Sequence, residues 1–434
     1  MTKIISAAVL TAVAGTATPS FAETEVQFWH AFTGRLGELV DEQVASFNDS
    51  QDAYTVTATH KGNYSETLNA GIAAFRAGEQ PHVLMVFEVG TATMMAAEGA
   101  VRPVHEVMAG GEFDPEAFIG AVKGYYTTTE GEMLSMPFNS STPVLWVNRD
   151  KLEGAGIDPD TEMTTWDQVG EVLTQLKDAG VDCPMTTAWQ SWIHLENLSA
   201  YHNVPFASQE NGFAGADATL ELNGPAQVKH ISTLGEWAQD GKFIYTGRRN
   251  EGGANFRGGE CALFTESSAG YAGIKAEADF AFDVRPLPYW EGAGDAPQNT
   301  IIGGASLWVM EGHDEADYDG VAAFLNFLSS PEIQAKWHQD TGYLPITSAA
   351  AELTREQGFY EENPGTDVAV AQMTANEPTA NSKGIRLGYF DQIRTVIDEE
   401  LEAVWAGDKE AQAALDSAKE RGDQLLRRFE QSTR

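Results

Sequence analysis

Short apolar runs alternate with stretches of helical periodicity along the first hundred residues. The runs 26–30, 54–58 and 82–87 are short and rich in apolar or β-branched side chains, as is typical of strands. Between them, in 34–47 and 65–76, apolar residues recur every three or four positions, which predicts amphipathic helices. The 82–87 run is almost continuously apolar, as in a strand that is covered on both faces. These repeated strand–helix units predict an α/β fold with helices on both faces of a sheet.

Two extended, proline-containing stretches separate this region from a second set of strands and helices. Proline disfavours helix at the residue before it, so 136–143 and 284–288 are expected to be extended connections between two lobes. A third connection is expected at 342–345, and the chain from 354 to 429 has helical periodicity. The pattern therefore predicts two lobes, each with its own α/β sheet, joined by several hinge crossovers.

The connections divide the chain into a leader and two discontinuous lobes. The first lobe is predicted to contain residues 23–141 and 285–342, and the second residues 142–284 and 343–434. A chain of 434 residues exceeds the size at which a single core stops growing, which also favours more than one domain.

The N-terminus has the features of a secretory signal peptide. Lys3 supplies a positive charge, residues 4–13 are apolar, and Ser20 and Ala22 form a small-x-small cleavage pattern. The stretch is too short and too polar to span a bilayer, so we expect cleavage after Ala22 and export to the periplasm. No later segment approaches the length of a membrane span, and no insertion into the membrane is expected.

The composition excludes several classes of partner. The chain has 64 acidic and 27 basic residues, a formal net charge of −37. Nucleic acids and anionic lipid surfaces require clustered Lys and Arg, so neither is an expected partner.

The two cysteines are too few for a disulfide scaffold or a four-thiolate zinc site. In an oxidising compartment Cys183 and Cys261 become candidates for one disulfide, because each lies in a strand-like run. Whether the two strands are neighbours is open at this point, and the alternative is two buried free thiols.

The sequence contains no complete catalytic motif of the kinds considered below. His105 and Glu106 begin like a zinc-protease helix, but Ala109 stands where the second histidine ligand is required. The sequence contains neither a Gly-x-Ser-x-Gly elbow nor a phosphate loop. We therefore expect no enzyme activity, no cofactor and no metal, and instead a cleft of hydroxyls, aromatic rings and single charges that recognises a small polar solute.

Several residue runs carry a family resemblance across nearly the whole chain. The most specific are KGNYSETL (61–68), EVGTATMM (88–95), PFNSSTPVL (137–145), IIGGASLWVM (301–310), WHQDTGYLPIT (337–347) and IRTVIDEELEAVW (393–405). The chain resembles the periplasmic solute-binding proteins of bacterial ABC importers, in the subfamily that binds sn-glycerol-3-phosphate and in the larger family that includes maltose-binding protein. The resemblance implies a periplasmic-binding-protein fold that closes on its ligand. It implies as partners glycerol-3-phosphate or a glycerophosphodiester such as glycerophosphocholine and the inner-membrane permease subunits, and it implies a monomer.

The resemblance also implies a set of ligand contacts. Arg394 would offer a planar fork to two phosphate oxygens, and Glu88 would accept from the glycerol hydroxyls. Hydroxyls and one backbone N–H would complete the site, and Trp166 would pack on the glycerol carbons. The full set is Tyr64, Glu88, Ser141, Trp166, Ser267, Gly304, Tyr343 and Arg394.

Each assignment has a structural alternative. Arg394 would otherwise form a surface ion pair with the acidic residues 398–400, and Glu88 would cap the helix that follows it. Gly304 would let a strand and a helix pack closely, and Trp166 would be a buried residue of a hydrophobic core. Two other functions are also open: an oligosaccharide-binding importer component that stacks sugars on Trp189 and Trp192, or a secreted hydrolase or lyase.

Overall fold

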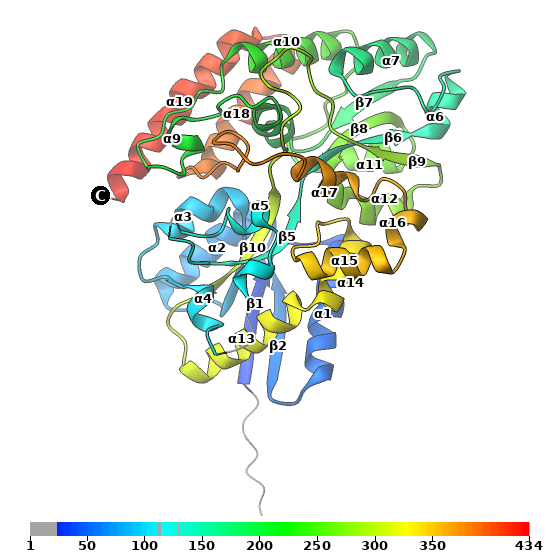
Figure 1. Cartoon of the computed structure of the whole chain (residues 1–434). Coiled ribbons are helices and arrows are strands. Elements are labelled where there is room, and N and C mark those ends of the chain that lie inside the picture. The colour runs from blue at the N-terminus through cyan, green and yellow to red at the C-terminus, as the bar shows by residue number, and fades with distance from the viewer. Residues whose placement is uncertain (1–23, 111–113, 129, 434) are drawn as a thin grey trace, which may run out of the picture.

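The computed structural model of the protein describes residues 24–110, 114–128 and 130–433. The signal peptide predicted at 1–22 lies outside these residues. No helix in the described ranges combines the length and the hydropathy that crossing a bilayer requires. Two lobes, stacked one above the other in Figure 1, are each built on a separate β-sheet.

The first sheet has the strand order β2-β1-β3-β10-β4, and β5 pairs with the first part of β10. β1, β2 and β3 are parallel, whereas β10 runs antiparallel to β3, β4 and β5. All five residues of β3 are buried, as their continuous apolar pattern predicts. The strands of this sheet are β1 Thr24–His30, β2 Tyr54–His60, β3 Val83–Phe87, β4 Val101–Arg102, β5 Met136–Ser141 and β10 Gly303–Met310.

Helices cover this sheet where the sequence pattern places them. α1 buries the stripe of Leu39, Val40, Val44 and Phe47. α2 begins with a capping box in which Asn63 and Glu66 exchange hydrogen bonds. The helices of the first lobe include α1 Gly34–Ser50, α2 Tyr64–Ala77, η1 Glu88–Gly90, α3 Thr91–Met95, α4 Val104–Val107, η2 Pro115–Ala117, α5 Gly120–Lys123, α13 Glu315–Ser329, α14 Pro331–Thr341 and α15 Ser348–Glu356.

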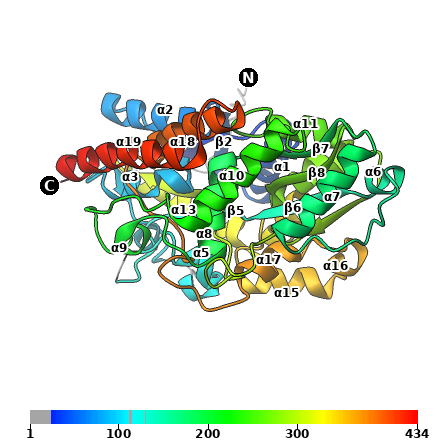
Figure 2. The ribbon, with the colours of Figure 1, turned by 90° about the horizontal axis from the view of Figure 1, so that it is seen from above.

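The second sheet has the order β7-β8-β6-β9 and lies in the upper lobe of Figure 1. Its strands are β6 Pro143–Asn148, β7 Cys183–Thr187, β8 Cys261–Ser267 and β9 Phe282–Arg285. Figure 2 shows α10, α18 and α19 crossing the top of this lobe, with α18 and α19 side by side. The remaining helices are α6 Arg149–Gly154, α7 Trp166–Asp178, η3 Trp192–Asn197, α8 Leu198–Tyr201, α9 Ser208–Asn211, α10 Pro225–Gln239, α11 Glu251–Arg257, η4 Ser268–Gly270, α12 Tyr271–Glu277, α16 Phe359–Glu362, α17 Val368–Met373, α18 Phe390–Trp405 and α19 Ala411–Ser432.

The hinge is a pair of extended crossing strands that contact each other. β5 ends at Ser141 in the first sheet and β6 begins at Pro143 in the second, so Thr142 alone makes the first crossing. Its Oγ1 donates to the carbonyl of Ile301 on the returning segment at 3.1 Å. Ser141 pairs with Gly303 at the start of β10. The first proline-containing stretch, 136–143, is therefore a sheet-to-sheet connection, as predicted. The second, 284–288, is not: the chain stays with the second lobe after β9, because the Trp166 N–H donates to the Tyr289 carbonyl and the Ile301 N–H donates to Asn197 Oδ1, and it enters the first sheet only at Gly303.

The third expected connection falls elsewhere. After Gly342 the chain stays with the first lobe, because the Leu344 N–H donates to the Ser140 carbonyl at 2.7 Å and Thr347 bridges to Phe118. α15 packs on α14, and the chain next reaches the second sheet where Gly365 lies against Val284 of β9 and α17 packs on β6. The chain thus leaves the first lobe after α15, later than the stretch 342–345, and the exact lobe boundaries remain a prediction.

The disulfide between Cys183 and Cys261 is formed. The two residues are register partners on the parallel neighbours β7 and β8, with Cα atoms 4.5 Å apart. The alternative of two free thiols is wrong, and the expectation that the two strand-like runs are neighbours is confirmed.

This disulfide is expected to stabilise the second lobe. It links residues 78 positions apart, for which the loop-entropy model gives roughly 4 kcal/mol, an upper figure for real proteins. The double variant C183A/C261A should lose about 2–4 kcal/mol of unfolding free energy in urea titrations. Equal urea midpoints for the double variant and the disulfide-bonded wild type would contradict this expectation.

Candidate functional site

A cleft of about 610 Å³ lies between the two lobes on one side of the hinge. Its volume is in the range of small-molecule sites, and both lobes contribute walls. The cleft brings together seven of the eight predicted ligand contacts, which are Tyr64, Glu88, Ser141, Ser267, Gly304, Tyr343 and Arg394.

Trp166 is the exception. It is 1% exposed, starts α7, and packs its ring against His194, His230 and Trp237 in the core of the second lobe. The expectation that it contacts ligand carbons is wrong, because its position at the start of a buried helix directs it into the core. The alternative of a core anchor is correct.

Two tyrosines form part of the first lobe's wall. Tyr64, the first residue of α2, stacks on Phe87 with ring centroids 5.3 Å apart, and its hydroxyl accepts from Asn139 Nδ2 at 2.9 Å. Burial raises the pKa of Tyr64 well above its ordinary value and that of Tyr343 to about 12. Both phenols therefore keep their protons, and because the two hydroxyls also hydrogen-bond to each other, one O–H of the pair is left to donate to an anionic ligand.

Gly304 has the backbone conformation that only glycine adopts easily. Its φ is +102°, and a Cβ here would lie 1.8 Å from the Asn139 carbonyl oxygen. The close approach of β10 to β5 thus explains this glycine, as the packing alternative proposed, and the same residue also lines the cleft.

Arg394 is buried between two carboxylates. Its Nε donates to Glu196 Oε1 at 2.7 Å, and Nη2 donates to Glu196 Oε2 at 2.7 Å and to Glu88 Oε1 at 2.6 Å. The prediction of a free fork for phosphate is therefore corrected: only Nη1 has no partner among the described residues. The surface ion pair with residues 398–400 is also wrong, because Arg394 is 8% exposed and points away from them to Glu88 and Glu196.

Three different elements position this triad. Glu88 follows β3 at the carboxyl end of a parallel strand, where α/β sheets usually bind ligands. Glu196 belongs to η3, a turn of π-helix, and Arg394 lies on the buried face of α18. Burial disfavours the charged guanidinium, but the two carboxylates more than offset this and hold the pKa of Arg394 above its ordinary value. Burial, with help from Glu196, raises the pKa of Glu88 despite Arg394.

Arg249 is the functional candidate that the sequence analysis missed. It lies just before α11, lines the cleft, and donates from Nη2 to Ser65 Oγ of the first lobe at 3.0 Å. Its Nη1 is buried without a partner among the described residues, and its guanidinium lies 5.9 Å from the ring centroid of Trp189. The available signal was the adjacent pair Arg248 and Arg249 in a strongly acidic chain.

Trp189 and Trp192 also line the cleft. In the oligosaccharide-binding alternative these two rings are expected to stack on sugars, yet they share the cavity with the residues expected to contact glycerol-3-phosphate. The Trp192 Nε1–H is buried without a partner among the described residues. The cleft therefore offers aromatic surface and an unused donor beside its charged groups.

Glu266 and Ser267 end β8 at the hinge side of the cleft. Glu266 Oε1 accepts from the Ser267 N–H at 2.6 Å, and Ser267 Oγ accepts from the Ala269 N–H at 3.0 Å. Glu266 is 3% exposed, and burial raises its pKa to about 8. This cleft carboxyl is therefore neutral at pH 7 and does not repel an anion.

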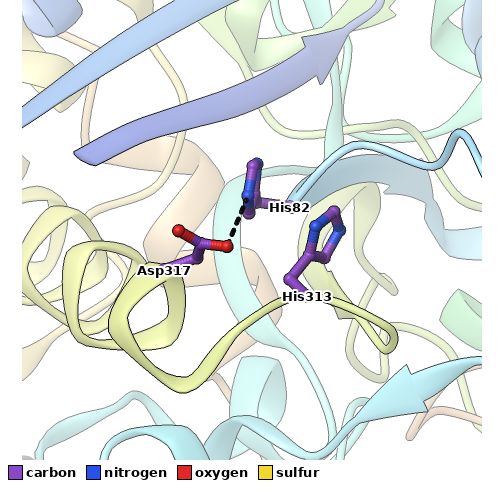
Figure 3. A group of neighbouring side chains, drawn as sticks. All are labelled: His82, His313 and Asp317. Carbon is purple, nitrogen blue, oxygen red and sulfur yellow. Dashed lines mark ion pairs between the residues drawn. The ribbon is translucent and has the colours of Figure 1, made fainter.

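Figure 3 shows the group of side chains in the described chain that most resembles a metal site: His82, His313 and Asp317, away from the cleft. His82 Nε2 lies 3.6 Å from Asp317 Oδ2. The two imidazoles stack with centroids 3.9 Å apart, and His313 Nε2 is hydrogen-bonded to the Pro81 carbonyl at 3.1 Å. His82 Nδ1 accepts the Gln27 N–H, which leaves the proton of the neutral ring on Nε2, facing Asp317. We assign no metal to this cluster.

Two α/β lobes around a hinge, with a polar and aromatic cleft between them, define a solute-binding protein. Residues 42–367 match the family of bacterial extracellular solute-binding proteins, and the chain belongs to this family. It is 52% identical over 416 residues to the sn-glycerol-3-phosphate-binding periplasmic protein UgpB of Escherichia coli K12, covering 95% of each chain. It is 52% identical over 418 residues to the UgpB protein of Yersinia pseudotuberculosis, covering 96% of this chain and 95% of the relative.

Solved structures share the fold at lower identity. UgpB from Mycobacterium tuberculosis in complex with glycerophosphocholine has a TM-score of 0.79 at 20% identity, covering 94% of this chain and 99% of that one. Maltose-bound MalE3 of T. maritima has a TM-score of 0.73 at 16% identity, covering 92% and 98%. The two-lobed fold inferred from the sequence is confirmed.

The titration of Glu266 is expected to shape the pH dependence of stability. The folded protein holds this proton up to about pH 8, whereas a carboxyl with the ordinary pKa of 4.5 releases it earlier in the unfolded chain. The stability from this group is therefore complete below pH 4.5 and lost as the pH rises through 8. Glu266→Gln should reduce the loss of unfolding free energy between pH 5 and pH 9 by about 2–4 kcal/mol in urea titrations. Identical pH slopes for variant and wild type would contradict the assignment.

Proposed function

We propose that this protein is the periplasmic binding component of an ABC importer and binds sn-glycerol-3-phosphate in the cleft between its lobes. It delivers the ligand to permease subunits in the inner membrane and does not transform it. The close relatives named for this ligand support the proposal. The observation that carries it is the cleft itself, in which one largely uncompensated guanidinium, Arg249, lies across from hydroxyl donors and from Glu88.

The phosphate end of the ligand lies toward Arg249. The Arg394 triad carries a net charge of −1 when both carboxylates are ionised, so it offers a donor at Nη1 but no positive field. Arg249 has no carboxylate on its guanidinium among the described residues, and its buried Nη1 is available for a charge-assisted bond. The net charge of −37 does not oppose this, because surface charges beyond about 8 Å are screened at physiological salt.

The glycerol end lies toward Glu88. One carboxylate oxygen of Glu88 accepts from Arg394, and the other is left to accept from ligand hydroxyls. Tyr64 and Tyr343 stand on the same lobe as neutral donors. The site thus separates the two ends of the ligand by charge.

Glycerophosphodiesters are a second ligand class. The cleft of about 610 Å³ exceeds what a three-carbon phosphate fills, and Trp189 and Trp192 add aromatic faces of the kind that bind quaternary ammonium groups. The structural relative from Mycobacterium tuberculosis is a complex with glycerophosphocholine. A neutral oligosaccharide would use the tryptophans but would bring no negative charge to the Arg249 guanidinium, so its hydrogen bonds there would be weaker than those of a phosphate.

Arg249→Gln tests the phosphate assignment. The loss of one charge-assisted hydrogen bond, about 1.5–3 kcal/mol, should weaken glycerol-3-phosphate binding roughly tenfold to a hundredfold in calorimetry. Arg248→Gln is the matched control, because its neighbouring guanidinium pairs with Glu402 and does not line the cleft. If the two variants bind glycerol-3-phosphate with equal affinity, the assignment of the phosphate to Arg249 is wrong. No binding of glycerol-3-phosphate by the wild type would overturn the function.

Glu88→Gln tests the glycerol end, with Glu196→Gln as its control. Both variants remove one carboxylate from Arg394, but Glu88 alone lines the cleft. Glu88→Gln should weaken glycerol-3-phosphate by about 1–3 kcal/mol without the same loss for inorganic phosphate in competition titrations. Glu196→Gln should shift both ligands alike. Equal weakening of both ligands by Glu88→Gln, with lowered thermal stability, would mean that Glu88 only supports the fold.

A further inference from the structure

A second cavity, of about 500 Å³, lies against the hinge strand outside the ligand cleft. Ile301 and Ile302 line this cavity, whereas the next two residues, Gly303 and Gly304, line the cleft. The other walls come from both lobes: the segment around α5, the α9 turn, and the chain between α17 and α18. Neither the family assignment nor the proposed cleft function uses this space.

Arg386 is a half-buried cation in this cavity without a counter-ion among the described residues. Its Nη2 donates to the carbonyls of Gly124, at 3.2 Å, and Tyr125. Its Nε is buried without a partner, and it forms no salt bridge with any described residue. The guanidinium lies 4.2 Å from the ring centroid of Phe213. Burial lowers the pKa of Arg386, because a guanidinium that is partly removed from water and has no anion beside it is less stable in its charged form.

Thr300 supplies a second unsatisfied polar group to the same cavity. It is 1% exposed, and its Oγ1 has no hydrogen-bond partner among the described residues. Buried hydroxyls in folded proteins are nearly always bonded, so an unpaired hydroxyl that lines a cavity points to a missing partner. Arg386 lines the same cavity and brings a donor and a positive charge to it.

The rest of the lining adds no net charge. Ile301, Ile302, Met373 and Pro378 provide apolar surface. The other charged pair in the lining, Lys383 and Glu210, is an internal ion pair. The cavity therefore carries one net positive charge, which suits a monoanion and disfavours a dianion.

We propose that this cavity is a binding site for a small organic monoanion, a carboxylate with a short apolar chain. The carboxylate accepts hydrogen bonds from Arg386 Nε and Thr300 Oγ1, and the chain packs on the isoleucines and on Met373. The two donors are the unsatisfied groups described above, so binding removes a penalty that the empty protein bears. The site is separate from the cleft and does not depend on the function proposed for it.

Butyrate is the probe, and 1-butanol is its uncharged analogue. Titration of the full exported protein, followed by calorimetry and by ligand-observed NMR, should show butyrate binding at least tenfold more tightly than butanol. Acetate should bind more weakly than butyrate, because it lacks the apolar chain. Butyrate that binds no better than butanol would overturn the proposal.

Two variants locate the site. Arg386→Gln should weaken butyrate tenfold or more, and exposed Arg427→Gln on α19 should leave it unchanged. Because Arg386 also holds two carbonyls, Thr300→Val is the safer variant. It should leave the stability of the empty protein equal or higher, since its hydroxyl is unpaired, yet weaken butyrate about threefold to tenfold. Unchanged butyrate affinity in Thr300→Val and Arg386→Gln would overturn the site.

A third variant tests whether butyrate binds in the cleft and not in the second cavity. Arg249→Gln should bind butyrate like the wild type, whatever its effect on glycerol-3-phosphate. If Arg249→Gln abolishes butyrate binding, the anion occupies the cleft and the proposed cavity site is wrong. A failure of glycerol-3-phosphate to bind the wild type would overturn the cleft function and leave the butyrate result intact.

Discussion

The buried ion triad of Arg394, Glu88 and Glu196 joins the two lobes and constrains much of the structure around it. Charges held this deep are stable only when they are paired and fully hydrogen-bonded. That requirement fixes the end of β3, the π-turn of η3 and the buried face of α18 relative to one another. The loss of any one partner would leave a buried charge uncompensated. Because Glu88 and Arg394 line the cleft and the three residues come from both lobes, the wall of the cleft depends on how the two lobes pack together.

The same pairing decides how the cleft recognises an anion. Two carboxylates cancel the field of Arg394, and for this reason the proposed site assigns the attraction for phosphate to Arg249 and to neutral donors. Burial keeps Glu266 protonated near neutral pH and removes one source of repulsion. A strongly acidic protein can thus hold an anionic solute, because the local donors at short range outweigh the screened charge of the surface.

The hinge gives the molecule two distinct faces. Thr142 and Ile301 bond the two crossing strands to each other, so one short ladder separates the cleft from the second cavity. Both spaces are lined by segments of both lobes. Each contains a guanidinium nitrogen that no described residue satisfies, at Arg249 and at Arg386, and these nitrogens are the strongest signs of ligand chemistry in the structure.

The sequence by itself determined the local elements, the alternation of strand and helix and the crossing at 136–143, because periodicity and proline positions are properties of neighbouring residues. The motif runs also pointed to seven residues that the structure places in the cleft. The sequence also placed both cysteines in strands. Only the tertiary structure decided what depends on distant partners. Arg394 meets Glu88 across 306 residues, Trp166 turns into the core, and Gly342 begins no crossing because Leu344 bonds Ser140. Arg249 became a site residue only when α11 was brought opposite Ser65. Charge pairing and burial are set by packing between segments that no local pattern brings together.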